Sequence, residues 1–330
     1  MKKQLASVLL MLSLMGSQQA RCAEPAADLT GFLDQHEMAN IQANGINIAY
    51  KIIGEPTAPP LLMIMGLSAS HRLWGDAFIE RLAHAGYLLV LFDNRDTGET
   101  QRMDEFGQPT IWWEMLKNLV GFEVNAAYTL EDMAMDSVAL MDALNITDAH
   151  IVGASMGGMI AQIIAAEHPE RVRSLVSIMS TTGAPHLPSP QDGAGDDLTD
   201  IAGSEGERRS ELEAIGLHVD AMPRQLMAII KSGDRTEQVK TISVPTLVIH
   251  GEDDTLLPPP HGKHTAAMIE GSRLVMFAGM GHNLPENVQP DLVAAMAEHI
   301  DSVESSRLSG QKAPDTTSTA GEEGKPPITN

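Results

Sequence analysis

The sequence has very little cysteine and little positive charge, and both shortages limit what the protein can do. One cysteine among 330 residues leaves no disulfide within the chain, and we expect no cysteine-based zinc cluster. Lysine and arginine total 22 against 44 aspartates and glutamates, which gives a formal net charge of −22. A field of this sign repels the phosphates of nucleic acids and the headgroups of anionic lipids. We therefore expect no nucleic-acid partner.

Long apolar runs are also missing. The N-terminal apolar stretch, residues 5–15, is too short to span a bilayer. It follows the basic start Met1-Lys2-Lys3 and precedes a small, polar segment, an arrangement typical of a secretory signal peptide. We predict a signal peptide over residues 1–23, export to the periplasm or the medium, and no stable membrane insertion after signal removal. The cleavage site stays open between Ala20, Cys22 and Ala23, and lipid anchoring through Cys22 is not expected because the preceding residues match that processing poorly.

What the chain does contain is enough apolar material for a large core, at 43% hydrophobic residues. Short apolar runs alternate with segments of helical spacing, which predicts an α/β fold with a mostly parallel sheet flanked by helices. Residues 40–53, centred on Asn44-Gly45, predict an antiparallel hairpin at one edge. The other predicted strands are 61–65, 87–92, 149–152, 172–179, 244–250 and 273–277, and the predicted helices are 74–85, 129–144, 159–168, 261–269 and 289–300.

Two segments break this alternation. Residues 183–206 are rich in proline, glycine and aspartate, and they lead into helical pieces, so we interpret 183–240 as a small lid inserted over the sheet. It divides the predicted core into residues 37–182 and 241–304. The composition of residues 305–330 predicts a disordered tail.

Residues 153–157, Gly-Ala-Ser-Met-Gly, are the strongest chemical signal in the chain. They follow an apolar strand and open a helix, which is the strand–turn–helix context of a nucleophile elbow. The glycines let strand and helix approach closely, and Ser155 then projects at the carboxyl edge of the sheet. Ser155 is the predicted nucleophile, and the Met156 N–H at the start of the helix is a predicted oxyanion donor.

A serine hydroxyl needs a base to remove its proton, and the base needs an acid to orient it. In folds with this elbow the acid and then the histidine follow the serine along the chain. Asp254 follows the predicted strand 244–250 and is the preferred acid, with Asp253 as its close rival. His282 follows the last predicted strand in a glycine-containing turn and is the predicted base.

The remaining candidate residues lie in loops and insertions. The loop that follows strand 61–65 makes the Leu67 N–H the second expected oxyanion donor. Trp112 and Trp113 either line the acyl or alcohol pocket or form a packing pair under the lid. His261 and His264 lie one helical turn apart, but no third ligand is evident, so we predict no metal site.

Over residues 37–300 the chain resembles the α/β-hydrolase superfamily, and within it the aclacinomycin methylesterase-like serine hydrolases. The matching segments are 65–66 (Met-Gly), 92–98 (Phe-Asp-Asn-Arg-Asp-Thr-Gly), 153–157, 244–249 (Val-Pro-Thr-Leu-Val-Ile), 260–264 (Pro-His-Gly-Lys-His) and 279–285 (Gly-Met-Gly-His-Asn-Leu-Pro). The resemblance implies carboxylic ester hydrolysis without a cofactor, and it matches Ser155, Asp254 and His282 to the family's triad and Leu67 and Met156 to its oxyanion donors. The short acidic insertion and the signal peptide depart from the family, so its anthracycline substrate is not transferred.

Together these patterns predict a serine carboxylic ester hydrolase that forms an acyl-enzyme on small to medium esters. A perhydrolase or haloperoxidase-like enzyme and a C–C bond hydrolase would use the same triad and stay open as alternatives. A non-catalytic binding module is less expected, because it predicts a missing triad member.

Overall fold

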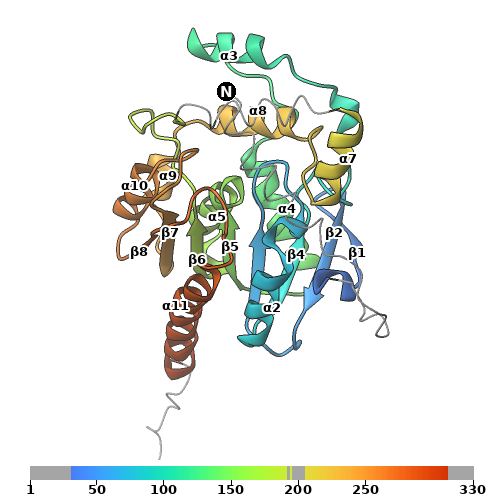
Figure 1. Ribbon diagram of the computed structural model, residues 1–330. Coiled ribbons are helices and arrows are strands. Elements are labelled where there is room, and N and C mark those ends of the chain that lie inside the picture. The colour runs from blue at the N-terminus through green and yellow to red at the C-terminus, as the bar shows by residue number, and fades with distance from the viewer. Residues whose placement is uncertain (1–30, 192–193, 195–204, 311–330) are drawn as a thin grey trace, which may run out of the picture. The chain divides into compact units, whose positions relative to one another are not determined.

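A computed structural model of the chain describes residues 31–191, 194 and 205–310 (Figure 1). The described residues contain an eight-stranded sheet in the order β1-β2-β4-β3-β5-β6-β7-β8. Its strands are β1 (Ala39–Ala43), β2 (Ile46–Ile53), β3 (Pro60–Ile64), β4 (Leu88–Phe92), β5 (Ala149–Ala154), β6 (Val172–Ile178), β7 (Thr246–Gly251) and β8 (Arg273–Phe277). The pairs β1–β2 and β2–β4 are antiparallel and all others are parallel. The predicted fold class is confirmed, including its antiparallel N-terminal hairpin.

The turn of that hairpin is made by two residues with left-handed backbones, Asn44 at φ 48° and Gly45 at φ 77°. Two positive φ angles in a two-residue loop match the twist of the flanking strands. The register follows directly, with Ala43 opposite Ile46.

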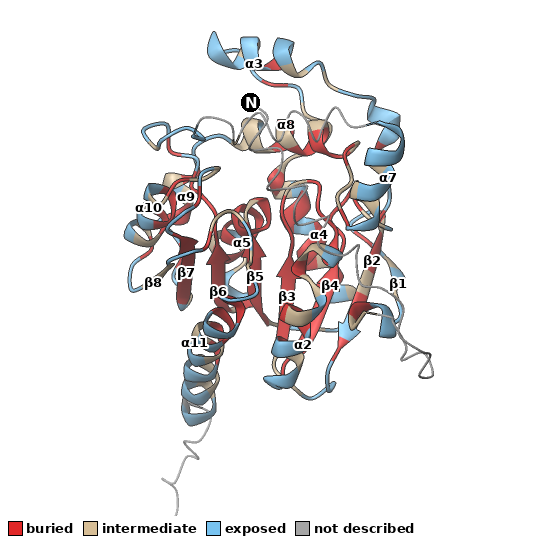
Figure 2. Ribbon diagram, in the orientation of Figure 1, coloured by how far each residue is buried: buried red, intermediate tan, exposed pale blue. Residues whose placement is uncertain are grey.

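Helices cover both faces of the sheet, and alternate residues of each strand point to opposite faces. On β3, Leu62 and Ile64 pack into a core with α4 (Leu130–Ala143) and α5 (Met156–Glu167). Leu61 and Met63 point to the other face and pack with α2 (Asp76–His84) and α11 (Gln289–Gly310). Figure 2 shows the resulting pattern, with buried strands between helices whose outer surfaces are exposed. The central strands are continuous apolar runs because both of their faces are buried.

The described residues between β6 and β7 add no strand to the sheet. They contain α7 (Gly206–Ala214), α8 (Met222–Ser232) and α9 (Thr236–Val239), followed after β7 by α10 (Pro260–Met268). A further helix, α3 (Ile111–Leu119), was not predicted; it comes from the connection between β4 and α4 and packs against α8. Figure 1 shows α3 and α8 above the sheet. The structure over the sheet is therefore built from two separate insertions, one with α3 and one with α7 to α9, rather than from one. We call these two insertions together the cap.

Both ends of the chain extend beyond the described residues. The signal peptide predicted over 1–23 lies outside the described residues, as does most of the tail. The tail prediction was wrong for residues 305–310, because α11 continues to Gly310. Ion pairs hold this part of the helix to the core: Arg307 contacts Asp148 at 2.6 Å and Glu304 contacts Arg173 at 3.3 Å. Among the described helices, none has the length and apolar character needed to cross a bilayer.

One buried histidine makes folding stability depend on pH. His150 in β5 is fully buried between the Ser174 hydroxyl at 2.8 Å and the Glu304 carboxylate at 3.2 Å. Burial lowers the pKa of His150 to about 3. In the unfolded chain a histidine has a pKa of roughly 6.5, so between these values only the unfolded state binds the proton. Stability from this group is therefore full above about pH 6.5 and is lost as the pH falls toward 3.

We expect His150→Gln to reduce the pH dependence of the free energy of unfolding. Urea titrations at pH 7.5, 6 and 5 should show the wild type losing up to about 1.4 kcal/mol more per pH unit than the variant. The matched control is His84→Gln, because His84 is exposed on α2. Parallel pH profiles for the wild type and His150→Gln would contradict the assignment.

Candidate active site

Ser155 lies in the sharp turn between β5 and α5. It is a non-glycine residue with a left-handed backbone, φ 55° and ψ −119°, and its N–H donates to the Ile178 carbonyl at 2.9 Å. A conformation of this kind costs about 1–3 kcal/mol and is retained where the surroundings enforce it. The surroundings do so through glycines: a Cβ on Gly153 would lie 2.2 Å from the Gly157 carbonyl oxygen, and one on Gly157 would lie 2.0 Å from the Ile64 carbonyl oxygen.

Three side chains that are distant in sequence meet at this turn. The Ser155 hydroxyl lies 2.9 Å from Nε2 of His282, and Nδ1 of the same imidazole lies 2.8 Å from Oδ2 of Asp254. A carboxylate only accepts hydrogen bonds, so Nδ1 carries the proton and Nε2 is free to accept from the serine hydroxyl. The Asp254 side chain is fully buried, whereas the imidazole is 18% exposed. The three side chains therefore form a continuous chain of hydrogen-bond contacts from a carboxylate through an imidazole to a hydroxyl.

The structure also distinguishes the two candidate acids. Asp254 is buried, and its other oxygen, Oδ1, accepts the N–H groups of Leu256 and Leu257 at 3.0 and 2.8 Å. Asp253 is exposed and accepts the Gly279 N–H at 2.9 Å. Asp254 is therefore the acid in contact with the imidazole, and Asp253 braces the turn that precedes His282.

A second histidine beside Asp254 was missed by the sequence reasoning. His250, at the end of β7, is fully buried, with Nε2 2.7 Å from the Leu257 carbonyl oxygen and 3.6 Å from Oδ2 of Asp254. Burial lowers the pKa of His250, so the ring is neutral and Nε2–H donates to Leu257. His250 thus holds the loop that carries Asp254. Its only signal in the sequence is a polar residue within an otherwise apolar strand.

The two expected oxyanion donors come from segments next to Ser155. Met156 is the first residue of α5, and Leu67 lies in the loop after β3. Among the described residues, neither backbone N–H has a hydrogen-bond partner. The loop passes so close that a Cβ on Gly66 would lie 3.1 Å from the Cβ of Ser155. Both N–H groups are therefore available near the serine hydroxyl.

The loop carrying Leu67 is fixed by the cap. The Ser68 N–H donates to Oε1 of Gln225 at 2.7 Å, and the His218 N–H donates to the Ser68 carbonyl at 2.7 Å. Ala69 forms an isolated antiparallel bridge with Leu217. These contacts set the direction of the backbone around Leu67, so the cap contributes to the site without supplying a reacting group.

Residues 94–98 brace the same rim through turn hydrogen bonds, such as those that the Thr97 N–H and hydroxyl donate to the Asn94 carbonyl at 3.0 and 2.7 Å, and through buried ion pairs. The Asp96 carboxylate binds the Arg224 guanidinium through two oxygens, and Arg95 binds Asp136 at 2.6 Å. The Asn94 amide donates to the Met65 carbonyl at 2.8 Å. Arg224 lies on α8, so the first of these pairs ties the cap to the core.

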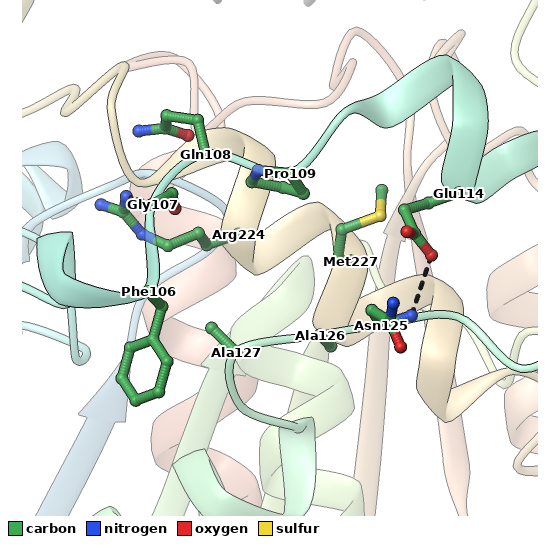
Figure 3. Close-up of a pocket in the computed structure, with 10 residues that line it drawn as sticks. All are labelled: Phe106, Gly107, Gln108, Pro109, Glu114, Asn125, Ala126, Ala127, Arg224 and Met227. Carbon is green, nitrogen blue, oxygen red and sulfur yellow. Dashed lines mark hydrogen bonds between the residues drawn. The ribbon is translucent and has the colours of Figure 1, made fainter.

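Two cavities lie under α3, and neither is lined by Ser155, Asp254 or His282. The first, of about 280 Å³, is shown in Figure 3. Its lining residues are Phe106, Gly107, Gln108, Pro109, Glu114, Asn125, Ala126, Ala127, Arg224 and Met227. The second, of about 220 Å³, includes Met159 of α5.

Trp112 and Trp113 line neither cavity. Both lie on α3, with 68% and 49% of their surfaces exposed, and their rings pack edge to face at 5.8 Å. The two rings therefore pack against each other in an exposed position, and their role in lining the acyl or alcohol pocket stays a prediction. The residues that α3 contributes to the cavities are Glu114 and Asn118.

The imidazole rings of His261 and His264 contact threonine hydroxyls. His261 Nδ1 lies 2.7 Å from the Thr181 hydroxyl, and His264 Nδ1 lies 3.0 Å from the Thr182 hydroxyl. Within the part of the chain that the structure describes, no group of three or more histidine, cysteine, aspartate or glutamate side chains is placed to hold a metal ion.

Comparison with known proteins gives the relationship of this chain. A family model described as alpha/beta hydrolase fold matches residues 59–197. Rhodomycin D methylesterase DauP of Streptomyces sp. (strain C5) is 31% identical over 293 residues, which cover 75% of this chain and 92% of that protein. The chain belongs to the α/β-hydrolase family.

More distant matches show how varied the family is. A putative non-heme bromoperoxidase, BpoC, of Mycobacterium tuberculosis is 27% identical, covering 72% of this chain and 91% of that protein. The crystal structure of a putative lipase from Acinetobacter baumannii AYE superposes with a TM-score of 0.65 at 19% identity, covering 82% of this chain and 93% of that one. At that identity the structural match shows the fold alone.

Proposed function

We propose that this carboxylic ester hydrolase acts through an acyl-enzyme on Ser155, with His282 as base and Asp254 as the acid that orients it. One observation carries the proposal: the unbroken contact from the Ser155 hydroxyl through both ring nitrogens of His282 to the buried Asp254 carboxylate. The similarity to methylesterases, at about a third of positions, supports ester hydrolysis as the reaction class.

In the first half of the reaction, His282 Nε2 takes the Ser155 proton as Oγ attacks the ester carbonyl carbon. Asp254 stabilises the imidazolium that forms, and it holds the ring so that Nε2 faces the serine. The imidazolium then gives its proton to the departing alkoxide, and the alcohol leaves. In the second half, water attacks the acyl-enzyme while His282 accepts its proton, and the acid is released with Ser155 restored.

The negative charge that develops on the carbonyl oxygen is met by the N–H groups of Leu67 and Met156. Each such donor lowers the barrier by about 3 kcal/mol in comparable sites, because it already points at the charge before the charge forms. Met156 adds the positive end of the α5 dipole. Their free N–H groups and the close approach of Gly66 to Ser155 support this role.

A fluorophosphonate probe tests whether the hydroxyl is activated. We expect one covalent adduct on Ser155, found by peptide mass spectrometry, and loss of esterase activity in step with labelling. Ser137 is a matched control, since its hydroxyl donates only to the Met133 carbonyl at 3.2 Å and should stay unlabelled. Absence of an adduct on Ser155 in the folded protein would contradict the proposal and favour a binding module.

Perhydrolysis is the second candidate, favoured by the similarity to the putative bromoperoxidase. Hydrogen peroxide would then replace water in the attack on the acyl-enzyme and release a peracid. Assaying one ester with and without hydrogen peroxide, and measuring acid and peracid together, separates the two reactions. Peracid as the main product at millimolar peroxide would favour perhydrolysis over hydrolysis.

A further inference from the structure

Arg235 differs from the other buried arginines of the described chain. Three arginines are buried: Arg95, Arg224 and Arg235. Arg95 is paired with Asp136 and Arg224 with Asp96. Arg235, although only 4% exposed, forms no ion pair with any described carboxylate.

The hydrogen bonds of Arg235 leave much of its guanidinium unused. Nη2 donates to the Thr181 carbonyl at 2.8 Å and Nη1 to the Gly233 carbonyl at 3.2 Å, while Nε has no partner among the described residues. Burial lowers the pKa of Arg235 to about 10, so the side chain remains charged at neutral pH. The Glu131 and Asp234 carboxylates act on this charge, but neither lies within ion-pair distance of the guanidinium. A buried charge without a contacting carboxylate is costly, so an anion in contact with it would stabilise this position.

A cavity of about 220 Å³ adjoins this arginine. Met159, Ile229 and Ile230 give it apolar walls, and Asn118 and Thr181 add polar groups. Gly183 also lines it, with φ +78°, and the backbone packs so closely that a Cβ there would lie 2.3 Å from the Gly233 carbonyl oxygen. The same carbonyl accepts the hydrogen bond from Nη1 of Arg235, so this glycine lets the backbone approach the group that holds the guanidinium.

Hydrogen bonds connect residues of the cavity wall to the backbone of the nucleophile. The Met159 N–H donates to the Ser155 carbonyl at 3.2 Å, so this wall residue lies one helical turn beyond the serine. The Ser180 hydroxyl donates to the same carbonyl at 2.8 Å, and the next residue, Thr181, holds Arg235. A ligand in this cavity would therefore contact Met159, one helical turn beyond Ser155, and Thr181, the residue after Ser180.

We propose that this cavity binds a carboxylate carried by the ester substrate, with Arg235 as its counter-ion. The inference rests on the proposed function and narrows its substrate class to esters with a carboxylate at the far end of a short apolar chain, such as half-esters of dicarboxylic acids. One guanidinium suits a single carboxylate, and the methionine and isoleucine walls suit the methylene groups between it and the ester.

Wild-type enzyme provides the first test. Monomethyl succinate, glutarate and adipate are compared with the neutral methyl esters of monocarboxylic acids of equal chain length. We expect kcat/KM to be at least about 10-fold higher for one of the half-esters than for its neutral counterpart, since a charge-assisted pair of this kind typically contributes a factor of this size. Equal or lower values for all three half-esters would overturn the inference.

Variants then assign the preference to Arg235. In Arg235→Met the half-ester to neutral-ester ratio should fall to near one, and Arg235→Lys should retain an intermediate ratio. Lys231→Met is the matched control: it removes a positive charge from the exposed face of α8, where Lys231 pairs with Glu123 at 3.2 Å, and the ratio should not change. An unchanged ratio in Arg235→Met would refute the assignment.

If Arg235→Met does not fold, the cavity is tested instead by measuring inhibition of the wild-type enzyme. Glutarate should then compete with the neutral ester at concentrations where valerate does not, and equal inhibition by the two would count against the cavity.

Ser155→Ala separates the two proposals. If it abolishes all ester hydrolysis while the wild type shows no half-ester preference, only the present inference fails; if it leaves hydrolysis intact, the proposed function fails.

Discussion

Ser155→Ala is expected to lower kcat for ester hydrolysis by roughly 10⁴- to 10⁶-fold, because no acyl-enzyme can form without the hydroxyl. Residual activity would come from the oxyanion donors and from His282 acting on water. The side chain makes one hydrogen bond, at 2.9 Å to His282, so the free energy of unfolding should change by no more than about 1 kcal/mol. Activity against p-nitrophenyl acetate and a thermal melt, measured on the same preparation, check both statements.

The matched control is Ser137→Ala, which also removes a buried hydroxyl but lies on α4 away from the site. It should retain wild-type kcat. If Ser155→Ala kept more than about a hundredth of the wild-type kcat, Ser155 would not be the nucleophile, because losses in true nucleophile variants are far larger.

The second large effect is a difference in activity between variants of the two neighbouring aspartates, Asp254 and Asp253. Asp254→Asn is expected to lower kcat by about 10⁴-fold, since the new amide donates to Nδ1 of His282 and forces the proton onto Nε2, where it faces the serine. The carbonyl oxygen of that amide can still accept the Leu256 and Leu257 N–H groups, which Asp254 Oδ1 accepts at 3.0 and 2.8 Å, so the loop should stay folded.

Asp253→Asn is the control for that experiment. The exposed side chain accepts the Gly279 N–H at 2.9 Å, which an amide oxygen can also do, so kcat/KM should stay within about threefold of wild type. Comparing kcat/KM for the two variants over pH 5 to 9 measures the contrast. A large loss in Asp253→Asn with a small one in Asp254→Asn would reverse the assignment of the acid.

Local patterns predicted much of the fold. The strand–turn–helix around Ser155 and the Asn44-Gly45 hairpin follow from short-range rules of backbone geometry. The same holds for the start of α4, where the Thr129 hydroxyl and the Asp132 carboxylate form a reciprocal cap. These features were predictable because a few adjacent residues determine each of them.

Other features were missed because they depend on long-range contacts. In α3 most of the apolar residues, including Trp112 and Trp113, lie in solvent, although an apolar helix face is normally buried. Whether such a face is covered depends on which distant elements pack against it. The extension of α11 to Gly310 depends on Arg307 reaching Asp148, 159 positions earlier. Neither feature can be seen within a local window.

The sequence by itself determined the α/β-hydrolase class, the candidate serine and histidine, and the pair of aspartates from which the acid comes, because each follows a strand whose carboxyl end must reach the same edge of a parallel sheet. Only the tertiary structure decided between Asp253 and Asp254, since the choice depends on which carboxylate is buried against the imidazole. It also decided that Arg235 is buried without a carboxylate beside a cavity. Burial and ion pairing join residues far apart in the chain, and no local pattern records them.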